Sequence, residues 1–275
     1  MPKRVTIAEV AELAGVHKGT VSRALNSRTE HQVNAVTLKR VQRAAKQLGY
    51  IPNIMARGLR TSLSMTVGVI VPDLTNPIFP PILRGIENYL SPRGYTALVA
   101  NTDGRESLER AAFDSLLERR VDGLIMATGL TVHPLIVEAH ERDVHIVMVN
   151  RRSQEALYPM VTGDDAAGIT AAVEHLVQLG HRKILHISGP RNFSTSVVRS
   201  DAFVAACNAN PSVSYSVAEA SALSVEVGES CMDSILMART KSPTAVVAGN
   251  DLLALGVLRS LRAHGLQCPD DISVV

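Results

Sequence analysis

The chain has 275 residues, which at roughly 150 residues per domain is enough for about two domains with hydrophobic cores of their own. Hydrophobic residues make up 46% and charged residues 20%, which excludes a collagen, a disulfide-stapled mini-protein and a disordered chain. No apolar run reaches the ~18 residues of a membrane helix, and no signal-peptide stretch follows the N-terminus. We therefore expect a cytoplasmic protein without a membrane partner.

The sequence contains no recognisable catalytic or metal-binding motif. The cysteines, which lack a C-x-x-C pair and are expected to be reduced and mostly buried, are Cys207, Cys231 and Cys268. Phosphate-loop, dinucleotide, nucleophile-elbow and H-E-x-x-H patterns do not occur. His175, His181 and His186 are spaced to fall on different elements and are expected to be ordinary histidines. We predict no enzyme, no cofactor and no metal site.

The charge is divided unevenly along the chain. Residues 1–60 contain eleven Lys and Arg against three acidic residues, a balance of +8, and the remainder contains 17 basic and 23 acidic residues, a balance of −6. A basic N-terminal segment followed by a mildly acidic body is typical of a protein whose first segment binds nucleic-acid phosphates and whose body has a different role. Exposed helices also carry many Lys and Arg, so the charge alone leaves a solvated helical face as an alternative.

The head has the pattern of three short helices. Thr6 and Glu9 have the spacing of a capping box, and the apolar period that follows predicts a helix over 6–14. A glycine turn leads into a second short helix over 18–25, and a third helical pattern over 33–48 ends at a glycine. Two helices joined by a glycine turn, with a third helix over them, predict a helix-turn-helix domain.

The second helix of a helix-turn-helix enters the major groove of duplex DNA with its N-terminal residues on base edges. Lys18 and Arg23 can donate to guanine acceptors, and Thr20 and Ser22 suit phosphate oxygens. The candidate DNA-binding residues of this helix are His17, Lys18, Gly19, Thr20, Ser22 and Arg23. A three-helix protein-interaction module is the alternative.

A short linker follows the head. Asn53 is a candidate N-cap for a helix of about eight residues, and isolated helices of that length are marginal in water. We expect this helix to fold only against DNA and a symmetry mate, with Leu59 either entering the minor groove or packing against the partner linker. The candidate DNA-binding residues of the linker are Asn53, Ala56, Arg57 and Leu59.

Strand and helix patterns alternate through the rest of the chain. Expected strands are 66–71, 95–100, 123–127, 144–149, 183–188, 244–248 and 272–275, and expected helices are 78–90, 108–118, 133–141, 166–179, 197–208, 225–237 and 252–263. Strict alternation predicts doubly wound parallel sheets covered by helices on both faces. The segment 151–163 lacks either period and contains Pro159, so we place the crossing between two lobes there. The expected division is 1–50 head, 51–63 hinge, 64–161 first lobe and 162–275 second lobe.

Open parallel sheets bind ligands beyond the carboxyl ends of their strands, and two facing lobes form a cleft. Phe79 could stack on a ligand ring or belong to the core, and Asn150 can donate to and accept from hydroxyls. Arg199 offers a planar fork of donors to a hydroxylated or anionic ligand, with an ion pair, for example to Asp201, as the alternative. Asn250 is a further candidate, although it or the next residue is also placed to cap a helix.

Two segments of the head carry a specific resemblance. VTIAEVAELAGVHKGTVSRALN at 5–26 and QLGYIPNIMARGLR at 47–60 closely resemble the N-terminus of the lactose-repressor and galactose-repressor family of bacterial transcription regulators. The resemblance implies that Lys18, Gly19 and Arg23 contact bases and that Leu59 enters the centre of the operator. Two residues depart from the family pattern: His17 replaces the usual serine, and Gly58 lies inside the hinge helix at a cost of up to ~1 kcal/mol in helix propensity.

The body resembles the same family. PDLTNPIF, DGLIM, MVNR, GHRKILHISGP, VVRSDAF and VAGNDLLALGVLRSLRAHGL look like its core, which has the fold of the periplasmic sugar-binding proteins. The positions that the resemblance assigns to the effector are Asp73, Phe79, Asn150, Arg199 and Asn250. The family continues beyond the position of Val275 with a Gly-Asp segment, a further effector contact and its last strands and helices, so we expect the C-terminal end to be missing.

The sequence therefore predicts a homodimeric repressor of transcription. Its partners are expected to be double-stranded operator DNA and a small effector, a sugar or alternatively a purine, which changes operator affinity by shifting the two lobes. The alternative function is a sugar-binding protein without a role in DNA regulation. Such a protein would need a secretion signal and has no use for a basic head.

Overall fold

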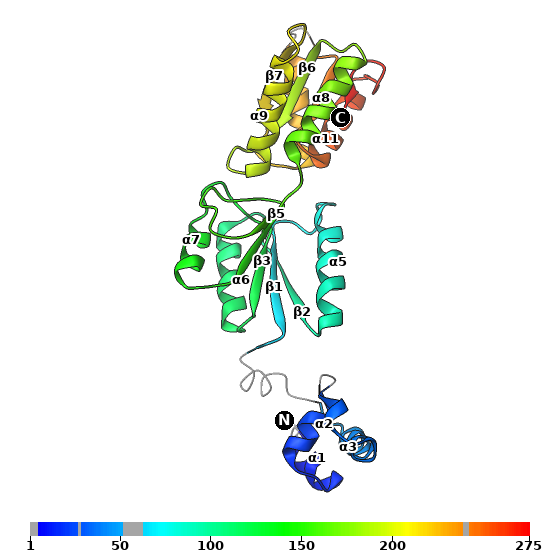
Figure 1. Cartoon of the computed structure of the whole chain (residues 1–275). Helices are drawn as coiled ribbons and strands as arrows, with labels where there is room; N and C mark the ends of the chain where they lie inside the picture. The colour runs from blue at the N-terminus through cyan, green and yellow to red at the C-terminus, as the bar shows by residue number, and fades with distance from the viewer. Residues whose placement is uncertain (1–4, 27–28, 52–62, 239–241) are drawn as a thin grey trace. The chain divides into compact units, whose positions relative to one another are not determined.

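The computed structural model describes residues 5–26, 29–51, 63–238 and 242–275. The chain divides into two compact units, residues 1–64 and 65–275 (Figure 1). Four residues predicted to contact DNA from the linker, together with the unusual Gly58, lie outside the described residues; the four are Asn53, Ala56, Arg57 and Leu59. In the described part of the chain no helix is long and apolar enough to cross a membrane.

The first unit contains the three predicted helices, α1 (Ile7–Ala14), α2 (Lys18–Ala24) and α3 (Ala35–Leu48). The predicted capping box is present: Glu9 N donates to Thr6 Oγ1 at 3.4 Å, and Thr6 N donates to Glu9 Oε2 at 2.6 Å. Gly15 ends α1 with a φ of +59°, a left-handed conformation that favours glycine. Val10, Val21 and Val41 are fully buried, so one side chain from each helix meets in a small shared core. A short 3-10 helix, Glu30–Gln32, was not predicted.

The second unit begins with a five-stranded parallel sheet that we call the first lobe. Its strands, in the spatial order β2-β1-β3-β4-β5, are β1 (Thr66–Val71), β2 (Thr96–Asn101), β3 (Gly123–Met126), β4 (Ile146–Val149) and β5 (Met160–Val161). Its helices are α5 (Phe79–Leu90), α6 (Glu106–Glu118) and α7 (Pro134–Glu141), and a 3-10 turn, Ser91–Arg93, follows α5.

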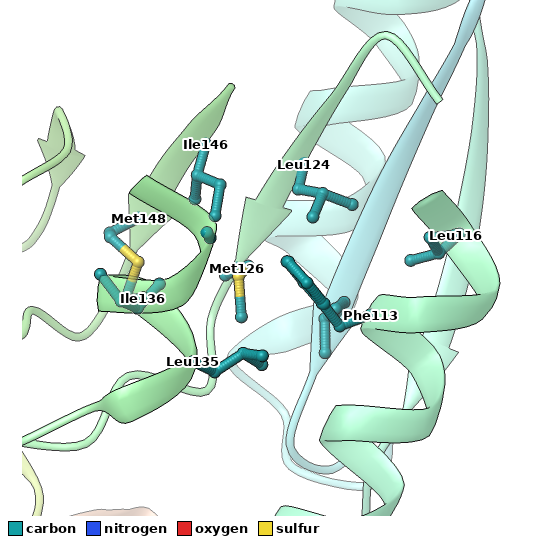
Figure 2. Close-up of a cluster of buried hydrophobic side chains, with 10 residues drawn as sticks. Phe113, Leu116, Leu124, Met126, Leu135, Ile136, Ile146 and Met148 are labelled. Atoms are coloured by element: carbon teal, nitrogen blue, oxygen red, sulfur yellow. The ribbon is translucent and has the colours of Figure 1, made fainter. Parts of the chain in front are cut away.

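Alternation along the strands sends neighbouring side chains of the first lobe to opposite faces of the sheet. Ile70 packs with residues of α6 and α7, whereas Val69 and Val71 pack with α5. Figure 2 shows the α6 and α7 side, where Phe113 lies between the strands and the helix that carries it. Burial on both faces explains the nearly continuous apolar run of β1.

The remaining residues form a second parallel sheet, the second lobe. Its strands, in the order β7-β6-β8-β9, are β6 (Lys183–Ser188), β7 (Ser214–Glu219), β8 (Ala245–Ala248) and β9 (Ser273–Val274). Its helices are α8 (Asp165–Gln178), α9 (Ser194–Asn208), α10 (Val225–Met237) and α11 (Asp251–Ala263). Residues of α8 and α9 share one core with Ile184 and Val247, and residues of α10 and α11 share another with Leu185 and Val246.

The strands and the cysteines of the body also depart from the expected pattern. β7 was not predicted, because it is a polar edge strand that is mostly exposed. The segment 151–163, expected to lack strands, contains β5, whose Met160 pairs with Met148 of β4. The cysteines are free as expected, but Cys207 alone is buried, and Cys268 is exposed.

Candidate functional site

Helix α2 presents two cationic side chains to solvent. Val21 and Ala24 pack into the core of the head, which fixes the orientation of the helix, and Lys18 and Arg23 are exposed. Thr20 and Ser22 are half-buried, with their hydroxyls on the same short helix. Charged donors and hydroxyls on one exposed helix form a surface that can donate to base edges and to phosphate oxygens.

His17 caps this helix, a role that the sequence did not reveal. It is the N-cap residue, and its Nδ1 accepts a hydrogen bond from the backbone N–H of Gly19 at 3.1 Å. A Cβ at position 19 would lie 3.3 Å from that Nδ1, so glycine leaves room for the capping ring. The histidine in place of the family's usual serine therefore supplies the same kind of acceptor to the start of α2.

Around the starts of α8 and α9, three cavities are lined by residues that the structure describes. One of about 380 Å³ is lined by residues that include Asp165, Arg199 and Asn250, and one of about 220 Å³ is lined by residues that include Asn150 and Thr195. These two share Gly163, Asp164 and Asp165. A third cavity, of about 320 Å³, shares Arg152, Ser194 and Val198 with the second. The cavities adjoin one another and bring three predicted effector residues into one region: Asn150, Arg199 and Asn250.

Arg199 is held in an ion pair, but not with Asp201. Its Nε donates to Asp165 Oδ1 at 2.8 Å, and its Nη1 donates to the carbonyl of Gly249 at 2.6 Å. Side chains two positions apart on a helix point in different directions, which explains why Asp201 is not the partner. The sequence analysis missed Asp165, whose position at the start of a helix that follows a strand was the available signal.

The two asparagines enter the cavities from the ends of strands. Asn150 directly follows β4 and has a φ of +64°, a conformation that asparagine tolerates better than most residues. Asn250 follows β8 as the N-cap of α11, and its Oδ1 accepts from Leu253 N at 2.9 Å. Capping uses one acceptor and leaves the amide donors of Asn250 beside the larger cavity.

The other two predicted effector residues lie apart from these cavities. Phe79 is 1% exposed and packs with Val69, Val71 and Ala127, which matches the core alternative. Asp73 accepts hydrogen bonds at its Oδ1 from Thr75 N at 2.8 Å and from Thr75 Oγ1 at 2.7 Å. Neither residue lines any of the three cavities described above.

The sequence also did not reveal the role of Arg151, a buried polar residue next to these cavities. Arg151, immediately after Asn150, is 6% exposed, and its guanidinium lies 3.8 Å from the ring centroid of Phe193. Burial, together with the charge of Arg199, lowers the pKa of Arg151 to about 10 against the opposing effect of Glu109, so the group stays charged at neutral pH. The Glu109 carboxylate accepts from Thr128 Oγ1 and lies 3.2 Å from His133 Nε2.

A helix-turn-helix unit joined to a two-lobed parallel α/β unit with polar cavities defines a transcription regulator with a ligand-binding body. Residues 6–53 match the model of bacterial regulatory proteins of the lacI family, and residues 64–275 match that of periplasmic binding proteins and the sugar-binding domain of the LacI family. The chain belongs to the LacI family.

Individual relatives agree with this assignment. The HTH-type transcriptional regulator PtxS of Pseudomonas putida is 33% identical over 277 residues, which cover 99% of this chain and 79% of that protein. The lac repressor dimer bound to operator and the anti-inducer ONPF has a TM-score of 0.85 at 29% identity, covering 99% of this chain and 82% of that one. The transcriptional regulator CelR in complex with cellobiose has a TM-score of 0.67 at 30% identity, covering 98% of this chain and 82% of that one.

These findings confirm the predicted fold and the predicted class of function. The head is a helix-turn-helix, the body has the periplasmic-binding-protein fold, and the chain is a DNA-binding transcriptional regulator. The relatives named above are transcription regulators and not enzymes.

Proposed function

We propose that this chain is a cytoplasmic repressor that binds a pseudo-palindromic operator as a homodimer and changes its operator affinity when a small effector binds the body. The observation that carries the proposal is helix α2, capped by His17, packed by Val21 and exposed at Lys18 and Arg23. An ordered helix with outward cationic donors is what readout of the major groove requires.

The roles on DNA follow from side-chain chemistry. Lys18 and Arg23 contact base edges, Thr20 and Ser22 contact phosphates, and Gly19 lets the backbone approach the DNA. The hinge over 51–63 orders on the operator, with Leu59 entering the minor groove between the two half-sites, and Asn53, Ala56 and Arg57 adding contacts. The solved lac repressor, a dimer on its operator, supports a homodimer here.

The effector occupies the adjoining cavities lined by Asn150, Arg199 and Asn250. Amide and guanidinium donors suit a ligand with several oxygen acceptors, and the cellobiose bound by the similar CelR regulator supports a sugar. A purine is the second candidate, and the burial of Phe79 in the core favours the sugar because it removes the expected ring for stacking. Asp73, which lines none of these cavities, is left out of the proposed site.

The test is a selection from a random pool of duplex DNA with the full chain at low ionic strength, with and without a panel of metabolites. We expect enrichment of a pseudo-palindrome, affinity that falls steeply with salt, and a change in affinity with at least one metabolite. A dimeric, folded chain that enriches no sequence under any of these conditions contradicts the proposal. Sugar binding without DNA binding would favour the alternative of a sugar-binding protein.

A further inference from the structure

Helix α3 carries a stripe of cations on the side opposite to the core of the head. Lys39 and Arg43 lie two positions before and after the buried Val41, and Lys46 lies two positions after the buried Ala44. At 3.6 residues per turn, two positions rotate a side chain to the opposite side of a helix. We call Lys39, Arg43 and Lys46, all of which are exposed, the α3 stripe.

The α3 stripe has no acidic partner. α3 contains no Asp or Glu over its 14 residues, and the three cations form no ion pair with a residue that the structure describes. A solvent-exposed helix typically carries charges of both signs, because like charges three or four positions apart weaken a helix. Lys39 and Arg43 are four positions apart, and Arg43 and Lys46 are three apart. The stripe therefore costs helix stability, which indicates a use for its charge.

The surroundings of the stripe favour phosphates as its ligand over a protein surface. The other exposed residues between positions 39 and 47 are all polar: Arg40, Gln42 and Gln47. Protein interfaces are built around apolar or aromatic anchors, whereas Lys and Arg contacts to the DNA backbone need no such anchor. The stripe spans ~10 Å of the helix axis, and duplex DNA carries one negative charge per ~1.7 Å. A run of phosphates therefore matches the stripe in charge and in length.

The stripe and helix α2 face different sides of the head. Val21 of α2 and Val41 of α3 are buried in the same small core, so the exposed side chains of the two helices point away from that core in different directions. Lys18 and Arg23 are the exposed cations of α2. A duplex that takes α2 into its major groove lies against Lys18 and Arg23, and it leaves the α3 stripe uncovered.

We propose that the α3 stripe holds a second segment of duplex DNA, through its phosphates and without sequence preference, while α2 reads the operator. The inference rests on the proposed function of α2 and adds a second DNA-binding surface to the head. Contacts to phosphates carry no sequence information, so any duplex can occupy this surface. The protein can then pass directly between two DNA segments, because one segment is held before the other is released.

The experiment uses the full chain, a short operator selected from a pool of random duplexes, and a second duplex of random sequence. The operator carries a fluorescence donor and the random duplex carries an acceptor. With one protein dimer per operator at low ionic strength, energy transfer reports both duplexes on one protein. We expect saturable transfer that disappears as the salt concentration rises. The absence of transfer at every concentration of random duplex overturns the proposal.

Two triple variants assign the surface. The stripe variant replaces all three stripe residues with glutamine, and the control variant removes the same charge from three exposed positions of the body: Arg84→Gln, Arg119→Gln and Arg262→Gln. We expect both variants to bind the short operator within threefold of the wild type. The affinity for the second duplex should fall at least tenfold in the stripe variant and stay within twofold in the control. Retention of the second duplex by the stripe variant, or an equal loss of operator affinity, overturns the proposal.

A conservative variant separates charge from folding. The stripe variant should melt at or above the wild-type temperature, because like charges have been removed from α3. The double variant Lys39→Arg with Lys46→Arg keeps the charge and should hold the second duplex within threefold of the wild-type affinity. Loss of the second duplex in this folded double variant overturns the proposal, because a phosphate contact requires the charge and not the particular side chain.

The class of partner and the proposed function are tested with the same preparations. Acceptor-labelled poly-L-glutamate replaces the random duplex in one arm, and tighter binding of this polymer than of DNA, lost in the stripe variant, would point to an acidic protein and overturn the proposal. A chain that selects an operator sequence but holds no second duplex retains the proposed function and loses the second surface. A chain that selects no sequence loses both.

Discussion

The Arg199 guanidinium and the Asp165 carboxylate join the starts of two helices. Arg199 Nε and Nη2 lie 2.8 and 2.6 Å from the same Asp165 oxygen, and the side chains are 22% and 16% exposed. Asp165 is the first residue of α8, where a negative charge is favoured by the helix dipole. Because Arg199 also donates to the Gly249 carbonyl, one side chain links α8, α9 and the end of β8 around the largest of the three cavities.

Replacing Arg199 with alanine should abolish the response to effector and spare effector-free operator binding, because the head retains all its own contacts. We expect the unfolding free energy to fall by ~1–2 kcal/mol. Removing one partner of a fully buried ion pair costs ~3–5 kcal/mol, and the cost is smaller here because this pair is partly exposed. Operator titrations with and without effector, and thermal unfolding, measure the two effects. Asp201→Ala, on the same helix, is the matched control, and an effector response retained by Arg199→Ala would contradict the assignment.

Replacing Lys18 with alanine should change which base is preferred at one position of each half-site. A side chain that donates to a base edge discriminates by ~1–3 kcal/mol for the affected pair, whereas a phosphate contact contributes equally to all sequences. Affinities for a set of single-base operator variants distinguish these roles. Lys46→Ala, at an exposed position of α3, provides the charge-matched control. A uniform loss across the set would make Lys18 a phosphate contact.

The cap at His17 should contribute to the stability of the head. His17→Ala removes the acceptor for Gly19 N and should lower the unfolding free energy by ~0.5–2 kcal/mol, the usual cost of losing an N-cap. His17→Ser should recover most of that loss, because serine also accepts at this position. Circular dichroism melts of the three proteins test the order. Equal stability of the alanine and serine variants would show that the cap contributes nothing.

His186 should make the body less stable in acid. It is fully buried, and burial lowers its pKa, with Arg199 acting in the same direction and the hydrogen bond to the Val247 carbonyl opposing them. The unfolded state then binds more protons below the ordinary pKa of about 6.5, so the unfolding free energy falls as the pH drops through and below that value.

The variant His186→Gln isolates this effect, because glutamine can donate to the same carbonyl and does not titrate. Between pH 7.5 and 5 the wild type should lose more unfolding free energy than the variant, by at most ~1.4 kcal/mol per pH unit below about 6.5. Denaturant titrations at a series of pH values measure this difference. The contributions of the other histidines to the pH dependence are the same in both proteins and cancel in the comparison. Parallel stability curves would show that the His186 pKa is not lowered.

Much of the fold could be predicted because local patterns and long-range packing agree. The strand Thr66–Val71 and the helix Val225–Met237 have the predicted bounds, since each combines a clear apolar pattern with well-defined ends. β7 escaped prediction because an edge strand with one partner carries a weak hydrophobic pattern. The candidate site was predicted in part: Asn150, Arg199 and Asn250 meet around the cavities, whereas Asp165 and Arg151 were missed.

By itself the sequence determined the helix-turn-helix, the alternation of strands and helices, and the family. These depend on periodicity, capping residues and short motifs, all of which act over a few neighbouring positions. It did not reveal that Gly228 lets α10 approach α11, where a Cβ would lie 2.6 Å from the Leu253 carbonyl oxygen. Nor did it pair Arg199 with Asp165, or Arg151 with Phe193. Those pairs are 34 and 42 residues apart, and only the packing of helices on the two sheets brings their charges and rings within a few ångströms.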